Sequence, residues 1–253
     1  MYRKCYISFS CFVLIGLTGL VLVRPLSAAQ SSPNAGRLEK MPPELETRFA
    51  LSALPPHLRD GASVYLLDPA QGYVSGKQGT NGFSCIVERT EWNRAHFTND
   101  VYTPICYDAE GTKIHLKVWL DVAKLRATGV SASDVKKEVE RRFKDKTYGP
   151  PGKRGLSYMT APIMRTYPNP DLAEKTVVTM SMPHVMYYAP GVSPKDIGAA
   201  PPPSPYPFIL DEGPHGYMIQ LIGEAEKAKI LADQKSLLAD LCAYRSFLCL
   251  KPR

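Results

Sequence analysis

The stretch that decides the fold is "ASVYLLDPAQGYVSGK", residues 62–77. Two short runs rich in Val, Tyr and Leu flank the segment 68–71, where Asp and Pro favour a tight turn. Such runs on either side of a turn predict a β-hairpin. Because a hairpin joins antiparallel strands, we expect an antiparallel sheet around this segment.

Further strands are expected on both sides of this hairpin. The runs 101–107 and 112–120 predict a second hairpin, closed by the turn "DAEG". In 112–120, apolar residues alternate from Ile114 to Leu120, which is typical of a strand with one buried face and places His115 on the other face. The remaining expected strands cover residues 82–89, 156–167, 176–189 and 216–222.

Helices are expected between and after these strands. "PPELETRFALSAL", residues 42–54, predicts a short N-terminal helix that begins at its prolines. Ser131 and Asp134 have the spacing of a capping box, which predicts a helix over 131–144 within a helical insertion. The run 224–241 has an apolar stripe and predicts a long C-terminal helix. Strands in runs, with helices between or after them, indicate an α+β fold with a mostly antiparallel sheet.

The N-terminus carries an export signal. Arg3 and Lys4 precede an apolar run over residues 5–23, and small residues follow up to Ala29. This pattern predicts a cleaved signal peptide over residues 1–29, and therefore a secreted or periplasmic protein. An uncleaved anchor is the alternative, because the run is long enough to span a bilayer.

The mature chain is expected to hold a flexible leader over residues 30–41 and one α+β domain over 42–253. Within this domain the proline-rich stretch 190–207 predicts a rigid surface loop. No further apolar run could span a membrane. The net charge of +7 includes three cations of the signal peptide, and the modest remainder requires no nucleic-acid partner.

Four cysteines remain after cleavage, an even number that predicts two disulfides in an oxidising compartment. Cys85 and Cys106 flank neighbouring predicted strands, so we expect them to pair. The remaining pair is Cys242 with Cys249. Seven residues of continuous helix would rise about 10.5 Å, too far for a disulfide, so the last helix must end near Cys242.

A methionine and histidine face is the first candidate site. Met180, Met182, His184 and Met186 fall on alternate positions, and a strand would turn all four to one side. Thioether and imidazole groups bind soft and borderline metals, so a copper or zinc site formed by Met182, His184, Met186 and His215 is one interpretation. The competing interpretation is a core strand that uses methionine to fill irregular gaps.

Three other interpretations are consistent with the sequence. Tyr187 and Tyr217 lie near the two Pro-His pairs and could line a small-ligand pocket. His215 could act as the base of an exported hydrolase with Asp211 or Glu212, although no nucleophile, nucleotide or zinc-protease motif accompanies it. A structural or interaction protein without a small-molecule site is the third alternative. The leading interpretation is an exported small-ligand or metal-binding domain.

Overall fold

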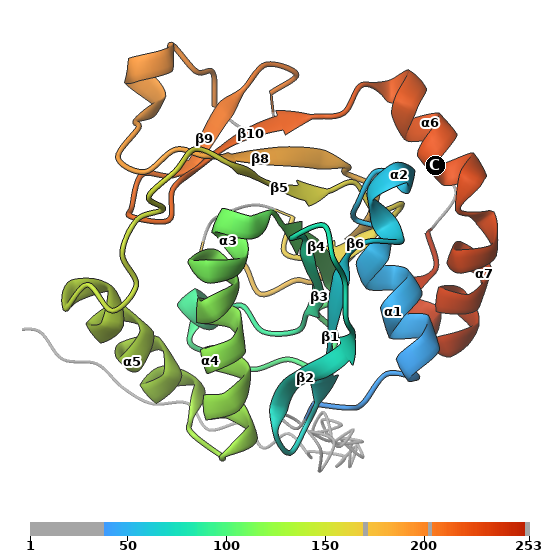
Figure 1. The fold of residues 1–253 in the computed structure, drawn as a ribbon, viewed down its shortest axis with the longest axis horizontal. Helices are drawn as coiled ribbons and strands as arrows, with labels where there is room; N and C mark the ends of the chain where they lie inside the picture. The colour runs from blue at the N-terminus through green and yellow to red at the C-terminus, as the bar shows by residue number, and fades with distance from the viewer. Residues whose placement is uncertain (1–37, 169–171, 202–203, 251–253) are drawn as a thin grey trace, which may run out of the picture. The chain divides into compact units, whose positions relative to one another are not determined.

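The computed structural model describes residues 38–168, 172–201 and 204–250 (Figure 1). These residues fall in one compact unit that spans residues 34–253. The signal peptide predicted over 1–29 and most of the predicted leader lie outside the described residues. Within the described ranges, no helix is long and apolar enough to cross a membrane.

The strands of the described residues are short. Their bounds are β1 Ser63–Asp68, β2 Gly72–Lys77, β3 Ser84–Glu88, β4 Thr103–Tyr107, β5 Leu156–Met159, β6 Met164–Thr166, β7 Val178–Met180, β8 His184–Tyr188, β9 Phe208–Asp211 and β10 Tyr217–Leu221. The main sheet has the order β2-β1-β3-β4-β5-β8-β10-β9, and β6 pairs with β7 separately. All neighbours are antiparallel except β1 and β3.

Helices cover both faces of this sheet. Their bounds are α1 Pro43–Leu51, α2 Pro56–Arg59, α3 Ala109–Lys113, α4 His115–Ala127, α5 Ala132–Lys144, α6 Glu224–Asp233 and α7 Lys235–Tyr244, with short 3-10 turns η1 Trp92–Arg94, η2 Pro194–Ile197 and η3 Ser246–Leu248. In Figure 1, α1 and α7 lie on one side of the strands β1, β3 and β4, and α4 with α5 on the other. The large antiparallel sheet with separate helices confirms the α+β class.

The side chains of β3 contribute to two hydrophobic clusters, one on each face of the sheet. Cys85 and Val87 pack into a cluster with Phe49 of α1 and Leu241 of α7. Ile86, between them, packs into a second cluster on the other face of the sheet, which includes residues of α4. Successive strand residues point to opposite faces, so a continuously buried strand serves two cores.

The hairpin predicted from residues 62–77 is confirmed, with Leu67 opposite Tyr73 and Asp68 opposite Gly72. The strand predicted over 112–120 is wrong, because these residues form α3 and α4. Asp108 accepts a hydrogen bond from the Gly111 amide at 2.8 Å and thereby caps α3. The predicted turn "DAEG" is therefore the start of a helix, and β4 pairs with β3 and β5 instead.

The C-terminal segment also differs in detail from the expected helix. The run 224–241 is divided at Gln234 into α6 and α7, and α7 ends at Tyr244, just beyond Cys242. The chain then turns through η3, so that Cys249 reaches Cys242 and forms a disulfide. The other disulfide joins Cys85 to Cys106, which lie opposite each other on β3 and β4.

Candidate functional site

His184 and His215 lie far apart. β8 and β10 are antiparallel, with His184 opposite Leu221 at one end and Tyr188 opposite Tyr217 at the other. Four residues of strand separate these ends by about 13 Å, and His215 lies beyond Tyr217. The two histidines therefore cannot share one metal ion in this fold.

The strand predicted over 176–189 is interrupted between β7 and β8, so Met180, Met182, His184 and Met186 do not share one strand face. Met186 is buried in the cluster beneath α4, and Met182 packs against that cluster. His184 is also buried, and one of its ring nitrogens, Nδ1, lies 2.7 Å from the Met182 carbonyl oxygen. Burial lowers the pKa of His184, opposed by this hydrogen bond. In the described ranges, no three His, Cys, Asp or Glu side chains converge so as to hold a metal.

Tyr187 and Tyr217 point to opposite faces of the sheet. Tyr217 is paired with Tyr188 and shares its face, whereas Tyr187 is paired with Met218 on the outer face. Tyr187 is 40% exposed, and Tyr217 is half-buried. The two rings consequently do not line one pocket.

The structure instead brings His215 against His115, the first residue of α4. The centres of the two imidazole rings are 4.5 Å apart. Tyr188 stacks on His115 at 4.2 Å, and Tyr217 lies 4.9 Å from it. Tyr107 of β4 is also stacked with His115, at 6.3 Å. We call these five residues, from α4, β4, β8, β10 and the turn before β10, the imidazole–tyrosine cluster.

Local sequence features build this cluster from distant segments. Asp108 accepts hydrogen bonds from the amides of Gly111 and Leu156, at 2.8 and 2.9 Å, and so joins the start of α3 to β5. The Tyr188 hydroxyl lies 3.0 Å from the same carboxylate. Gly111 leaves the space this hydroxyl occupies, because an added Cβ would overlap it. The network fixes Tyr188 beneath His115.

The cluster contains buried polar atoms that lack hydrogen-bond partners among the described residues. They are both ring nitrogens of His115 and the hydroxyl of Tyr107. Such atoms are rare in folded proteins and often mark a bound water or ion. Burial and, secondarily, the neighbouring His215 lower the pKa of His115 to about 3. The ring is therefore neutral at pH 7, with one nitrogen that carries a lone pair and one that carries a proton.

His215 is buried, although less deeply than His115. It is 8% exposed, and its Nε2 lies 2.9 Å from the carbonyl oxygen of Gly149. Burial lowers its pKa, and the bond to Gly149 and the charge of Asp211 oppose this shift. Asp211 itself accepts a hydrogen bond from the Gly213 amide. Within the described part of the chain, no hydrogen bond joins His215 to Asp211 or Glu212, so a general base oriented by either carboxylate is not assembled.

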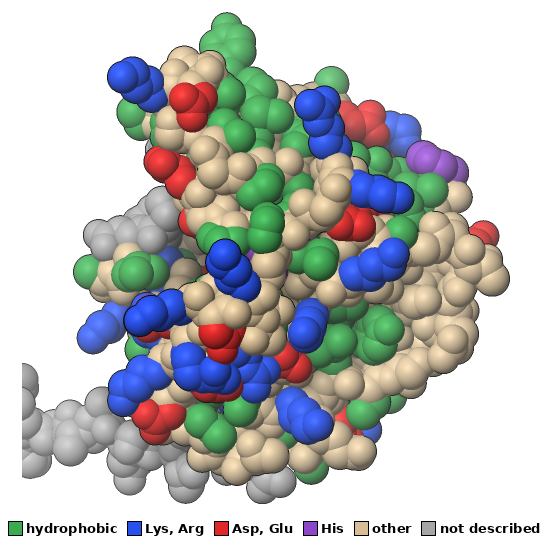
Figure 2. Space-filling view, turned by 60° about the vertical axis from the view of Figure 1, so that its left-hand side comes forward, with side chains coloured by type: hydrophobic (Ala, Val, Ile, Leu, Met, Phe, Trp, Pro, Cys, Tyr) green, Lys and Arg blue, Asp and Glu red, His purple; other side chains and the backbone are tan. Residues whose placement is uncertain are grey.

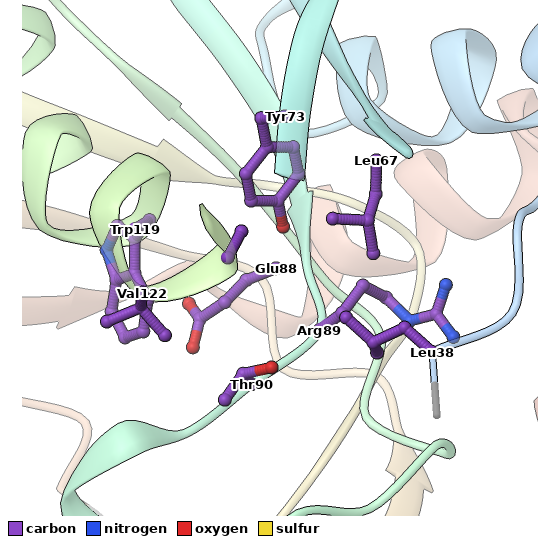
Figure 3. A pocket seen from close by; sticks show the side chains of 9 residues that line it. Leu38, Leu67, Tyr73, Glu88, Arg89, Thr90, Trp119 and Val122 are labelled. Carbon is purple, nitrogen blue, oxygen red and sulfur yellow. The ribbon is translucent and has the colours of Figure 1, made fainter. Parts of the chain in front are cut away.

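A small cavity lies elsewhere under α4. Glu88, at the end of β3, lines it together with Thr90 and Trp119 (Figure 3). Figure 3 shows the Glu88 carboxyl directed into the space beside Trp119, while the guanidinium of Arg89 points away from it. The centre of a water molecule can move over about 10 Å³ there, which is room for about one water. The cavity is therefore far too small for an organic ligand.

Glu88 makes no hydrogen bond or ion pair with any described residue, and burial, with the nearby Glu91, holds its pKa well above the usual range. The folded protein must therefore keep a proton on Glu88 at pH values where the unfolded chain releases it. This cost is absent below the unfolded pKa near 4.3 and grows as the pH rises.

We expect Glu88→Gln to raise the free energy of unfolding at pH 7 and to change it little at pH 4. The amide keeps the shape of the carboxyl without its charge. Urea unfolding at both pH values measures the effect. Glu44→Gln, at an exposed position of α1, is the matched control. Equal stability of Glu88→Gln and wild type at pH 7 would contradict the prediction.

Comparison with protein-family models, with curated proteins and with solved structures finds no match.

Sequence reasoning missed His115 because it placed residues 112–120 in a strand. The helix was signalled by Asp108 as an N-cap and by buried positions that continue at helical spacing to Val122 and Arg126. No local signal pairs His115 with His215, since a hundred residues separate them in the sequence.

Proposed function

We propose that this is an exported, non-catalytic binding domain that holds a divalent transition-metal ion, copper or zinc, between His115 and His215. The observation that carries this proposal is His115, whose two ring nitrogens are buried beside a second imidazole and have no partner among the described residues. A metal ion bound there would give one of these nitrogens a partner.

The spacing of the two rings supports a shared ion. Two imidazoles bound at about 90° to one ion, the angle of a square-planar Cu(II) site, with metal–nitrogen distances of about 2.0 Å, have ring centres about 4.5 Å apart. The tetrahedral angle of Zn(II) gives about 5.1 Å, so the spacing favours Cu(II). The centres of His115 and His215 are 4.5 Å apart. Imidazole suits Cu(II) and Zn(II), and no thioether belongs to the cluster, which disfavours Cu(I).

Export is supported by the N-terminal pattern and by the two disulfides, which persist in oxidising compartments. With two protein ligands, other coordination positions remain open to water or an external ligand. The domain is thus suited to carrying an ion, or a small anion bound through it.

Calorimetric titration of the purified protein with Cu(II) and Zn(II) tests the proposal. We expect one ion per chain, with at least about tenfold weaker binding in His115→Phe and in His215→Phe. Phenylalanine retains the ring and limits the effect on folding.

His184→Phe is the matched control, because His184 is an equally buried imidazole outside the cluster. It should bind the ion as the wild type does. Loss of binding in His184→Phe, with binding retained in His115→Phe, would show that the metal site lies at His184 and its neighbouring methionines. Absence of any binding in the folded wild type would overturn the proposed function.

A further inference from the structure

Nearly all of the chain's net positive charge lies in one segment. Residues 109–155, which contain α3, α4, α5 and the loop after them, hold twelve Lys or Arg and six Asp or Glu, a net charge of +6. The whole chain has +7, so the other 206 residues are close to neutral. The positive charge is therefore concentrated in one segment and is not spread over the whole chain.

Most acidic side chains of the segment form ion pairs with basic side chains of the same segment. Five carboxylates pair with four cations of α5, namely Lys136, Lys137, Arg141 and Arg142. The sixth acid, Glu110, accepts hydrogen bonds from the backbone amides of Gly152 and Lys153. Arg126 is buried and donates to neighbouring oxygens.

The remaining cations are exposed, and no ion pair joins them to a described residue. They are Lys113, Lys117, Lys124, Lys144, Lys146, Lys153 and Arg154, which we call the basic face. Figure 2 turns the side of the molecule that bears α4 and α5 toward the viewer, and basic side chains gather over the centre and lower left of this view.

We infer that the basic face docks the protein on an anionic phospholipid surface. Unpaired lysines near a bilayer that contains acidic lipids are each attracted to its negative potential. Six of the seven cations are lysines, which act as mobile point charges and suit a diffuse layer of phosphates.

The composition of the face disfavours other anionic partners. None of the large hydrophobic side chains exposed in the described residues belongs to this segment, so no aromatic platform is available for stacking of single-stranded bases. Only Arg154 offers the bidentate guanidinium that reads a guanine edge. Because the described residues of this segment expose no large hydrophobic side chain, we expect binding at the headgroup level without insertion, and hence strong salt dependence.

Co-sedimentation of the mature protein with phosphatidylcholine vesicles that contain roughly 30% phosphatidylglycerol tests this inference. We expect binding at low salt, loss of binding near 0.5 M salt, roughly, and none to pure phosphatidylcholine. Lys117→Glu/Lys146→Glu/Lys153→Glu should lower the partition coefficient at least about tenfold. Lys113→Glu/Lys124→Glu/Arg154→Glu is the second variant, should the first not fold.

The matched control is Lys175→Glu/Lys195→Glu/Lys235→Glu, which makes the same charge change at exposed lysines outside the basic face. It should keep most of the binding. An equal loss in the control, equal binding to neutral vesicles, or unchanged binding in the basic-face variants would overturn the inference. Tighter binding to heparin or duplex DNA than to the acidic vesicles would overturn the choice of a lipid surface.

Discussion

Gly111→Ala is expected to lower the free energy of unfolding by about 3 kcal/mol. Gly111 is buried in the first turn of α3, and an added Cβ would overlap the Tyr188 hydroxyl and lie 2.8 Å from its Cζ atom. The hydroxyl cannot withdraw without cost, because it lies 3.0 Å from Asp108 and 2.9 Å from the Leu156 carbonyl oxygen. Urea unfolding at neutral pH measures the change.

Two further variants test whether the overlap with Tyr188 causes the loss of stability in Gly111→Ala. Gly223→Ala should be nearly neutral, because no atom lies within 4 Å of its added Cβ. Tyr188→Phe removes the oxygen that the Gly111→Ala methyl meets. The double variant Gly111→Ala/Tyr188→Phe should therefore be more stable than the sum of the two single changes predicts. A fully additive pair would show that the overlap with Tyr188 is not the cause.

Removing the Cys85–Cys106 disulfide by Cys85→Ala/Cys106→Ala is also expected to cost about 3 kcal/mol. The bridge closes a loop over a sequence separation of 21, and the chain-entropy relation gives about 3 kcal/mol for a loop of that length. Both cysteines are fully buried between β3, β4 and α1, so the lost contacts add to the cost. Thermal and urea unfolding under non-reducing conditions check the value.

The second disulfide supplies the comparison. Cys242→Ala/Cys249→Ala opens a loop with a sequence separation of only 7, near the end of the described chain. The same relation predicts a smaller loss, about 2 kcal/mol. If Cys242→Ala/Cys249→Ala proved less stable than Cys85→Ala/Cys106→Ala, loop-closure entropy would not be the main contribution of these disulfides to stability.

Local patterns predicted much of this fold. Features that act within a few residues predicted the hairpin of β1 and β2, the strands β3, β8 and β10, the helix α1 and the cap of α5 at Ser131. A turn sequence or a cap is satisfied locally, so it can be recognised without knowing the neighbours.

The error at α4 has a physical cause. Ile114, Leu116, Val118 and Leu120 alternate over a window too short to separate strand from helix. β-Branched residues and a tryptophan favoured the strand interpretation. The helix is selected by tertiary packing, since Leu116 and Val122 contact two different clusters.

The candidate site could be predicted only in part. His215 and Tyr217 were recognised as candidates, and both belong to the imidazole–tyrosine cluster. Their pairing with His184 and Tyr187 assumed that neighbours in sequence share a site. In the antiparallel register of β8 and β10, His184 lies at the end of the strand pair away from His215, and Tyr187 lies on the opposite face of the sheet from Tyr217. Only the long-range packing of α4 on the sheet supplies His115.

Two exposed ion pairs join the N-terminal and C-terminal segments of the described residues. Glu39 forms an ion pair with Arg245, and Arg48 of α1 forms another with Asp240 of α7. Beneath these pairs, Phe49 of α1 and Leu241 of α7 lie in one buried cluster with residues of β3 and β4. Separating the two segments would therefore break both ion pairs and open this part of the core to water, so the beginning and the end of the fold lose their contacts together.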